Sequence, residues 1–145
     1  KLVVTHRDPT VCAASTMSLL AFLQGRTSGK ADPRASARHV ADFIERCCDG
    51  LLAFARQNGD DALIHVPYPE LVADPIGTAH RIAVACDHEL RPDALAALER
   101  HVRERTQHRY GVHRYALEDF GFRREDLDDR YRAYREHFRV ALERK

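Results

Sequence analysis

The sequence predicts an α/β fold, and three observations lead to this prediction. Residues 2–5 form a short apolar run of strand length, and residues 62–66 form a second one. About five longer segments repeat apolar residues three and four positions apart, as helices that cover a sheet do. Two short strands, expected to be parallel, are too few for an independent sheet. We therefore expect residues 1–145 to be part of one α/β domain, whose sheet is completed by a preceding segment of the chain or by a second copy in a homo-oligomer.

The first strand leads directly into a helix. The chain opens Lys1-Leu-Val-Val-Thr-His6, which is typical of a buried strand. Asp8 is a favoured N-cap residue, and Pro9 suits the first helical position. Apolar residues then recur at helical spacing to about Gln24. Strand, turn and helix together form the opening half of a βαβ unit.

A loop, a long helix and the second strand follow. Residues 25–34 are small and polar and contain Gly and Pro, which predicts a loop. An apolar stripe at helical spacing then runs from Val40 to Ala55, and Gly59 is suited to end this helix. The second strand, residues 62–66, is closed by Pro67-Tyr68-Pro69.

Three further helices are expected in the remaining sequence. One begins at Asp74-Pro75, a second near Pro92 and the last near Arg124. Between residues 105 and 115 the periodicity stops. The last helix carries one apolar face, which consists of Leu127, Tyr131, Tyr134, Phe138 and Leu142.

Composition excludes several classes of protein. The 23 Lys and Arg nearly balance the 22 Asp and Glu, so binding to nucleic acid through a broad positive field is not expected. No run approaches the roughly 18 apolar residues of a membrane span, and the start does not resemble a signal peptide. We expect a cytoplasmic protein that meets any anionic ligand at a local site.

The cysteines and histidines do not predict a metal site. The four cysteines form no CxxC pair, and the nine histidines form no HxxxH or HExxH motif. We expect four buried or half-buried thiols in a reducing compartment. His6 is expected to be a packed histidine, because alternation along the strand points it away from its neighbours.

Arg7 and Ser15 are the first residues that suggest binding chemistry. Arg7 follows the first strand, where open α/β sheets place their ligands, and its planar guanidinium suits phosphate oxygens. The helix that starts at Pro9 directs free N–H groups to the same place. Ser15 lies about two turns into that helix. The alternative is structural: Arg7 pairs with a neighbouring carboxylate, and Ser15 packs on the helix.

Three segments, in the right order, resemble the sulfotransferase family. The first is Val3-Val4-Thr5-His6-Arg7-Asp8-Pro9 with Ser15 eight residues after the arginine. The second is His65-Val-Pro-Tyr68-Pro-Glu-Leu-Val-Ala-Asp74-Pro75, in which Pro69 replaces the usual acidic residue. The third, His113-Arg114-Tyr115-Ala-Leu-Glu118-Asp119-Phe120-Gly121, is similar to a segment near the C-terminus of bacterial members. The resemblance spans nearly the whole chain.

The resemblance implies a P-loop-like sulfotransferase fold, of which this chain is the C-terminal part. Members transfer a sulfuryl group from 3′-phosphoadenosine-5′-phosphosulfate (PAPS) to an acceptor hydroxyl or amine and release adenosine 3′,5′-bisphosphate. It implies that Arg7 and Ser15 hold the 3′-phosphate and that Tyr68 approaches the adenine. For Tyr68, a core tyrosine at the strand end is the alternative.

A basic segment over residues 105–115 is a further candidate. It contains Arg109, His113 and Arg114, has no acidic residue, and includes Gly111, which gives it freedom to close over a phosphate. In the sulfotransferase family, a basic loop in this region completes the 3′-phosphate pocket. The alternative is a solvated basic loop.

Two expected parts of such an enzyme are absent from these residues. No Gly-rich loop with Lys follows a strand to hold the 5′-phosphosulfate, and no catalytic His precedes the Arg7 strand. We therefore expect no catalytic residue and negligible transferase activity from residues 1–145 alone. Two other functions stay open: an inactive nucleotide- or phosphate-binding module, and a helical protein-interaction module. The acceptor is not predicted.

Overall fold

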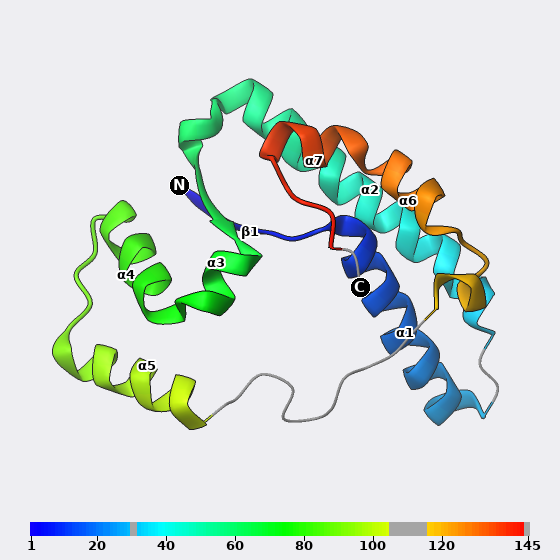
Figure 1. Ribbon diagram of the computed structural model, residues 1–145, viewed down its shortest axis with the longest axis horizontal. Coiled ribbons are helices and arrows are strands. Elements are labelled where there is room, and N and C mark those ends of the chain that lie inside the picture. Colours follow the sequence, from blue (N-terminus) through cyan, green and yellow to red (C-terminus); the bar gives the residue numbers. More distant parts are fainter. Residues whose placement is uncertain (30–31, 105–115, 144–145) are drawn as a thin grey trace. The chain divides into compact units, whose positions relative to one another are not determined.

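A computed structural model describes residues 1–29, 32–104 and 116–143 of the chain, which divides into two compact units. The sheet unit comprises Lys1–His6 and Asn58–Val112, and the helical unit comprises Arg7–Gln57 and His113–Lys145. Both units are therefore built from two separate stretches of sequence, which the colours of Figure 1 trace.

The sheet unit contains the two predicted strands. Strand β1 (Leu2–His6) pairs in parallel with β2 (Leu63–Pro67). In the register, Leu2 lies opposite Leu63 and His6 opposite Pro67. On β2, Leu63 and Val66 are buried, whereas Leu2 and Val3 of β1 keep almost half of their surface exposed. The prediction of two short parallel strands is confirmed.

Three α-helices follow β2 in the sheet unit. They are α3 (Tyr68–Ala73), α4 (Pro75–Ala85) and α5 (Pro92–Glu104), and a 3-10 turn, η1 (Asp60–Ala62), precedes the strand. The sequence predicts α4 and α5 but not α3, because six residues are too few for apolar periodicity to stand out. At the junction, the Asp74 carboxylate accepts a hydrogen bond from the Gly77 amide at 2.8 Å and so starts α4.

Two long helices form the first part of the helical unit. Helix α1 (Pro9–Ser28) starts where the sequence predicts but runs past the expected Gln24, and Gly29 ends it with a φ of 67°. Helix α2 spans Pro33–Asn58. The loop expected over residues 25–34 is therefore much shorter, because most of those positions are helical.

The second part of the helical unit contains η2 (Leu117–Phe120), α6 (Arg124–Arg130) and α7 (Arg132–Phe138). The prediction of a single last helix is wrong, because the helix is interrupted at Tyr131, between α6 and α7. The Tyr131 ring at this point is buried in the core, and its hydroxyl donates to the Ala41 carbonyl at 3.1 Å. The described residues thus hold seven α-helices rather than about five.

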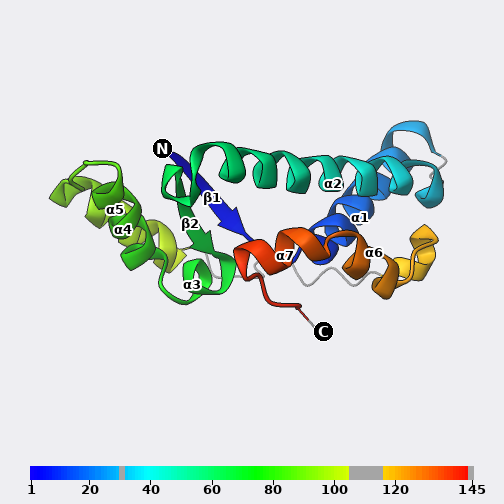
Figure 2. The same cartoon turned by 90° about the horizontal axis from the view of Figure 1, so that it is seen from above.

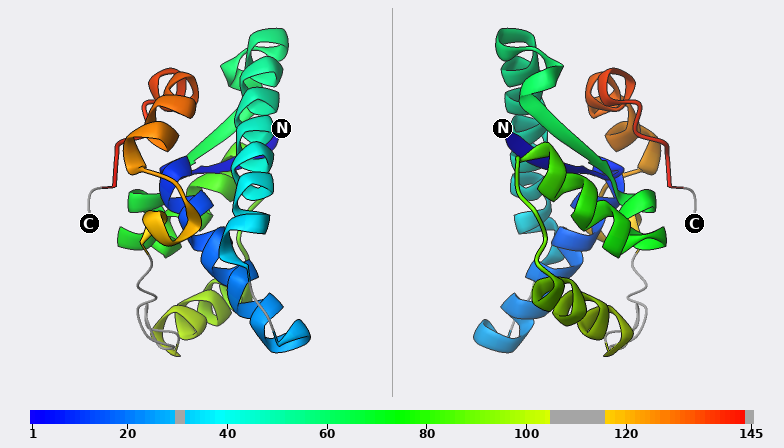
Figure 3. Two further views of the ribbon diagram at one scale, coloured as in Figure 1. Left: turned by 90° about the vertical axis from the view of Figure 1, so that its right-hand side faces the viewer. Right: turned by 90° about the vertical axis from the view of Figure 1, so that its left-hand side faces the viewer.

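The core of the helical unit joins its two sequence segments. Figures 2 and 3 show α6 and α7 running along α2, with α1 beside them. The Arg130 guanidinium bridges the Asp42 and Glu45 carboxylates of α2 at 2.6 and 2.5 Å. The buried cluster consists of Ala13, Ala14, Met17, Ala37, Val40, Ala41, Cys48, Leu52, Leu117, Phe120, Leu127, Tyr131 and Tyr134.

Candidate functional site

The turn between β1 and α1 is fixed by Asp8. This residue is buried, with 1% of its surface exposed, and it caps α1 by accepting the Thr10 amide at 3.0 Å. Its other carboxylate oxygen accepts the backbone amide of Glu143 at 2.9 Å. Next to it, the Thr10 hydroxyl donates to Asp128 of α6 at 2.6 Å. Hydrogen bonds of Asp8 and Thr10 therefore fix the start of α1, and with it the adjacent Arg7, to Glu143 and to α6.

Arg7 forms a two-pronged ion pair with Glu143. The Arg7 Nε lies 2.8 Å from Glu143 Oε1, and Nη2 lies 2.9 Å from Oε2. About a quarter of each side chain stays exposed (29% and 26%). This is the fork-to-fork geometry in which arginine binds carboxylates and phosphates alike. The structural alternative for Arg7, a pair with a carboxylate, is thus present in the structure.

Ser15 lies on the exposed side of α1 and does not pack into the core. One turn before it, on a neighbouring position of the helix surface, is Cys12. Burial raises the pKa of the Cys12 thiol, while the Arg7 guanidinium acts to lower it and Glu143 to raise it. Cys12 is thus close enough to both ionic groups for their charges to affect its thiol, and Ser15 lies one helical turn beyond Cys12 on α1.

Glu143 is a site residue that the sequence does not reveal. It belongs to the irregular segment 139–143 that follows α7, where Arg139 adopts a left-handed φ of 53° and ends the helix. The carbonyl of Glu143 also accepts a 3.4 Å bond from Arg124. Its partner Arg7 is 136 residues away in the sequence, so neither spacing nor periodicity could have paired them.

The structure does not test the other candidate residues at this site. Tyr68 is half-buried and begins α3, in the sheet unit, whereas Arg7 and Ser15 belong to the helical unit. Arg109, His113 and Arg114 lie outside the described residues. Arg7 and Ser15 belong to the same unit, and the shared phosphate site, the adenine contact and the basic segment stay predictions.

His6 and His65 form a close pair in the sheet unit. His6 is buried as expected, with 4% of its surface exposed, and its Nε2 lies 2.9 Å from His65 Nδ1. The two rings stack with centroids 5.0 Å apart. Burial, with the neighbouring His65 ring as the second cause, lowers the pKa of His6 from 6.5 to about 4. His6 is therefore neutral in the folded protein at neutral pH.

The thiols differ from expectation in part. Cys48 is buried and Cys12 half-buried, as predicted, but Cys47 and Cys86 are exposed. Burial raises the pKa of Cys48 to about 12. Within the described part of the chain, no group of three or more His, Cys, Asp or Glu is placed to hold a metal ion.

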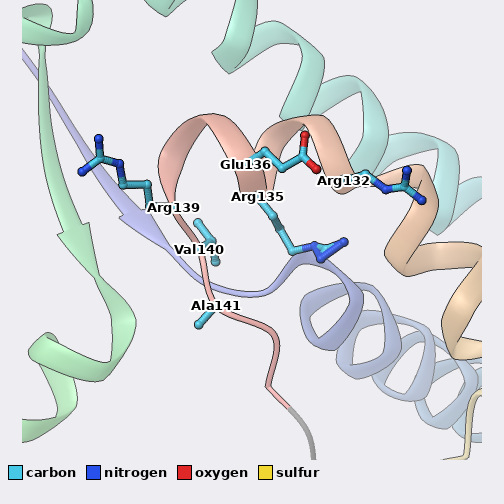
Figure 4. A pocket seen from close by; sticks show the side chains of 6 residues that line it. All are labelled: Arg132, Arg135, Glu136, Arg139, Val140 and Ala141. Carbon is cyan, nitrogen blue, oxygen red and sulfur yellow. The ribbon is translucent and has the colours of Figure 1, made fainter.

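A cavity of about 400 Å³ lies beside α7 and is lined by cationic side chains. Figure 4 shows Arg132 and Arg139 pointing to opposite sides of it. Arg135 donates to the Asp128 carbonyl at 2.5 Å, and its buried Nε has no hydrogen-bond partner in the described structure. Because these arginines do not converge, the cavity is less suited to hold one phosphate than the Arg7 guanidinium.

Comparison with known proteins identifies the family. The model of the "Sulfotransferase family" matches residues 1–93, so the chain belongs to the sulfotransferase family. The fold is similar to that of the crystal structure of sulfotransferase STF9 from Mycobacterium avium, with a TM-score of 0.83 and 24% sequence identity. The match covers 97% of this chain and 36% of that one. No curated protein matches the chain.

The comparison agrees with the fold predicted from the sequence, an α/β part of a sulfotransferase. This chain spans about a third of the length of the solved structure it matches. Across the three described stretches, no helix is long and apolar enough to cross a membrane.

Proposed function

We propose that this chain is the 3′-phosphate-binding part of a PAPS-dependent sulfotransferase. Membership of the family supports a role in sulfuryl transfer. The observation that carries the finer proposal is the geometry of the Arg7 guanidinium, which follows β1 and binds both oxygens of the Glu143 carboxylate. A phosphate monoester offers the same pair of oxygens and a greater negative charge.

Ser15 completes this proposed grip. Its exposed hydroxyl lies on α1 beyond Cys12, where it can donate to a phosphate oxygen that Arg7 holds. Arg7 and Ser15 thus bind the donor and fix its orientation without taking part in bond changes. In the reaction, an acceptor oxygen or nitrogen attacks the sulfur, the bond from sulfur to the 5′-phosphate oxygen breaks, and adenosine 3′,5′-bisphosphate leaves.

The proposal assigns positioning, not proton transfer, to these residues. Holding the far end of the donor keeps the sulfuryl group in line with its acceptor, which lowers the entropic cost of the transition state. The proposal needs a 5′-phosphosulfate loop and a base in addition to these residues, and it assigns neither role to residues 1–145. These residues alone are expected to show negligible transferase activity. PAPS as donor, a cytoplasmic location and an unidentified small-molecule acceptor are parts of the same proposal.

The experiment is a titration with adenosine 3′,5′-bisphosphate and, separately, AMP, which lacks the 3′-phosphate. Calorimetry on the full-length protein should give tighter binding of the bisphosphate. Arg7→Ala should remove most of that preference, roughly tenfold or more, because a charge-assisted two-pronged contact is lost. Arg34→Ala, at an exposed arginine of α2, is the matched control and should keep it.

A purely structural Arg7 would give a different result. The ion pair with Glu143 is the observation that favours this second reading, in which the chain is an interaction module or an inactive relative. In that case Arg7→Ala would lower the melting temperature but leave the two nucleotides equally bound. This outcome would contradict the proposal that Arg7 binds the 3′-phosphate.

A further inference from the structure

Glu143 already accepts hydrogen bonds from the Arg7 N–H groups that a bound phosphate would need. Both of its carboxylate oxygens contact Arg7, through Nε at 2.8 Å and Nη2 at 2.9 Å. A phosphate bound in the same fork would take the same two N–H groups. The two anions would also repel each other at this distance. Glu143 and a phosphate therefore cannot share the Arg7 guanidinium in this geometry.

The segment that carries Glu143 is held mainly by polar contacts at that one residue. Its amide donates to Asp8 Oδ2 at 2.9 Å, its carbonyl accepts a long 3.4 Å bond from Arg124, and its carboxylate takes Arg7. The preceding residues Ala141 and Leu142 are exposed. Little apolar surface is therefore buried over residues 141–143, so their release would expose few core atoms. Val140, just before them, packs against the core, and its amide donates to the Arg135 carbonyl at 2.9 Å, so the release stops there.

We propose that Glu143 is an internal competitor for the Arg7 site, and that binding of the nucleotide's 3′-phosphate displaces it and releases residues 141–143. This inference rests on the proposed function, because it takes the 3′-phosphate as the ligand of Arg7. The carboxylate holds the guanidinium in its binding orientation while the site is empty. The ligand class is a phosphate monoester, whose charge exceeds that of the carboxylate it replaces.

Competition of this kind has a direct thermodynamic consequence. A ligand that must first displace Glu143 binds more weakly than it would to an open Arg7. Removing the carboxylate charge should therefore tighten binding of adenosine 3′,5′-bisphosphate and leave AMP unchanged. A residue that merely orients Arg7 would do the opposite, because its loss would weaken binding of the bisphosphate.

The test compares Glu143→Gln with wild type by calorimetry in the full-length protein. We expect roughly three- to tenfold tighter binding of the bisphosphate, the size of a partly exposed ion pair, and no change for AMP. Glu125→Gln, at an exposed glutamate in the first turn of α6, controls for loss of one negative charge and should match wild type.

A second measurement needs no substitution. Hydrogen exchange in peptides covering residues 139–143 should become faster when saturating bisphosphate is added, because the Glu143 amide loses its bond to Asp8. AMP should leave the exchange unchanged. Slower exchange with the bisphosphate would overturn the inference, since the segment would then be clamped instead of released.

The outcomes separate this inference from the proposed function. If Arg7→Ala weakens bisphosphate binding but Glu143→Gln has no effect or also weakens it, the 3′-phosphate site stands and the competitor does not. If Arg7→Ala leaves the preference for the bisphosphate unchanged, the proposed function itself fails. A loss of folding in Glu143→Gln would appear in its melting curve, and the exchange experiment on wild type would then decide.

Discussion

At the residue scale, the pair of His6 and His65 makes the stability of the folded protein depend on pH. His6 of β1 and His65 of β2 bring ring nitrogens within 2.9 Å, which is a hydrogen bond when one ring donates and the other accepts. A proton on both facing nitrogens would remove the acceptor and place two positive charges together. Burial adds to this cost, so the folded protein keeps His6 neutral.

The histidine pair predicts a loss of stability in acid. The unfolded chain protonates His6 near pH 6.5, but the folded protein does so only near pH 4. Between those values the unfolded state binds more protons, so the free energy of unfolding falls as pH is lowered through this window. The loss is at most about 3 kcal/mol. It is absent above about pH 6.5 and complete below about pH 4.

Urea denaturation between about pH 7.5 and about pH 4.5 measures this effect. His6→Gln removes the titrating ring and should flatten the pH dependence, whatever it does to stability at neutral pH. His80→Gln, at an exposed histidine of α4, is the matched control and should keep the wild-type slope. An unchanged slope in His6→Gln would show that other groups cause the acid sensitivity.

At the scale of elements, the short helices after residue 116 complete the core of α1 and α2. Leu127 of α6 is buried to 1% exposure, and Tyr131 follows it in the break before α7. Because the two residues are four positions apart, their side chains lie on the same side and both reach the core. The Arg130 pair with Asp42 and Glu45 then fixes α6 against α2.

Leu127→Ala should therefore destabilise the protein by about 2 to 5 kcal/mol, because it leaves a cavity among packed side chains. Leu19→Ala, on α1 with 56% of its surface exposed, makes the same chemical change without a cavity. It should cost less than about 1 kcal/mol. Chemical denaturation of both variants checks the difference, and equal losses would mean that α6 is not packed as described.

The helices and the site were predictable from the sequence to different degrees. The start of α1 was predictable, because Asp8 is a typical N-cap residue and Pro9 a typical first helical residue. The interruption between α6 and α7 at Tyr131 was not predictable, because the apolar spacing from Leu127 to Phe138 fits one continuous helix. The hydrogen bond from Tyr131 to Ala41, 90 residues away, has no local signal either. Arg7 and Ser15 are candidates because of their spacing in a family motif, and their joint role stays a prediction. Glu143 was not predictable, because only the folded chain brings it to Arg7.

At the scale of the whole chain, the helical unit is made of two stretches separated by most of the sheet unit. Its core takes Leu117, Phe120, Leu127, Tyr131 and Tyr134 from the second stretch. Without them, the apolar faces of α1 and α2 would have no partner from that side.

Deleting residues 117–145 should therefore abolish cooperative unfolding of the helical unit. The apolar faces of α1 and α2 would be left exposed, and residual helix would lack fixed packing. Calorimetry should show no sharp transition for this unit, and a dye that binds exposed apolar surface should fluoresce more strongly. A truncated chain that still melts sharply would contradict the role given to the second stretch.

The same division sets an order of events during synthesis. Translation adds about 5 to 20 residues per second, and 60 positions separate the end of the first stretch, Gln57, from Leu117. For about 3 to 12 seconds, Met17, Val40 and Leu52 are therefore already synthesised while the core residues of the second stretch are not. A chaperone that shields nascent apolar helices would meet this chain during that interval, and a slower codon usage across residues 58–116 would lengthen the encounter.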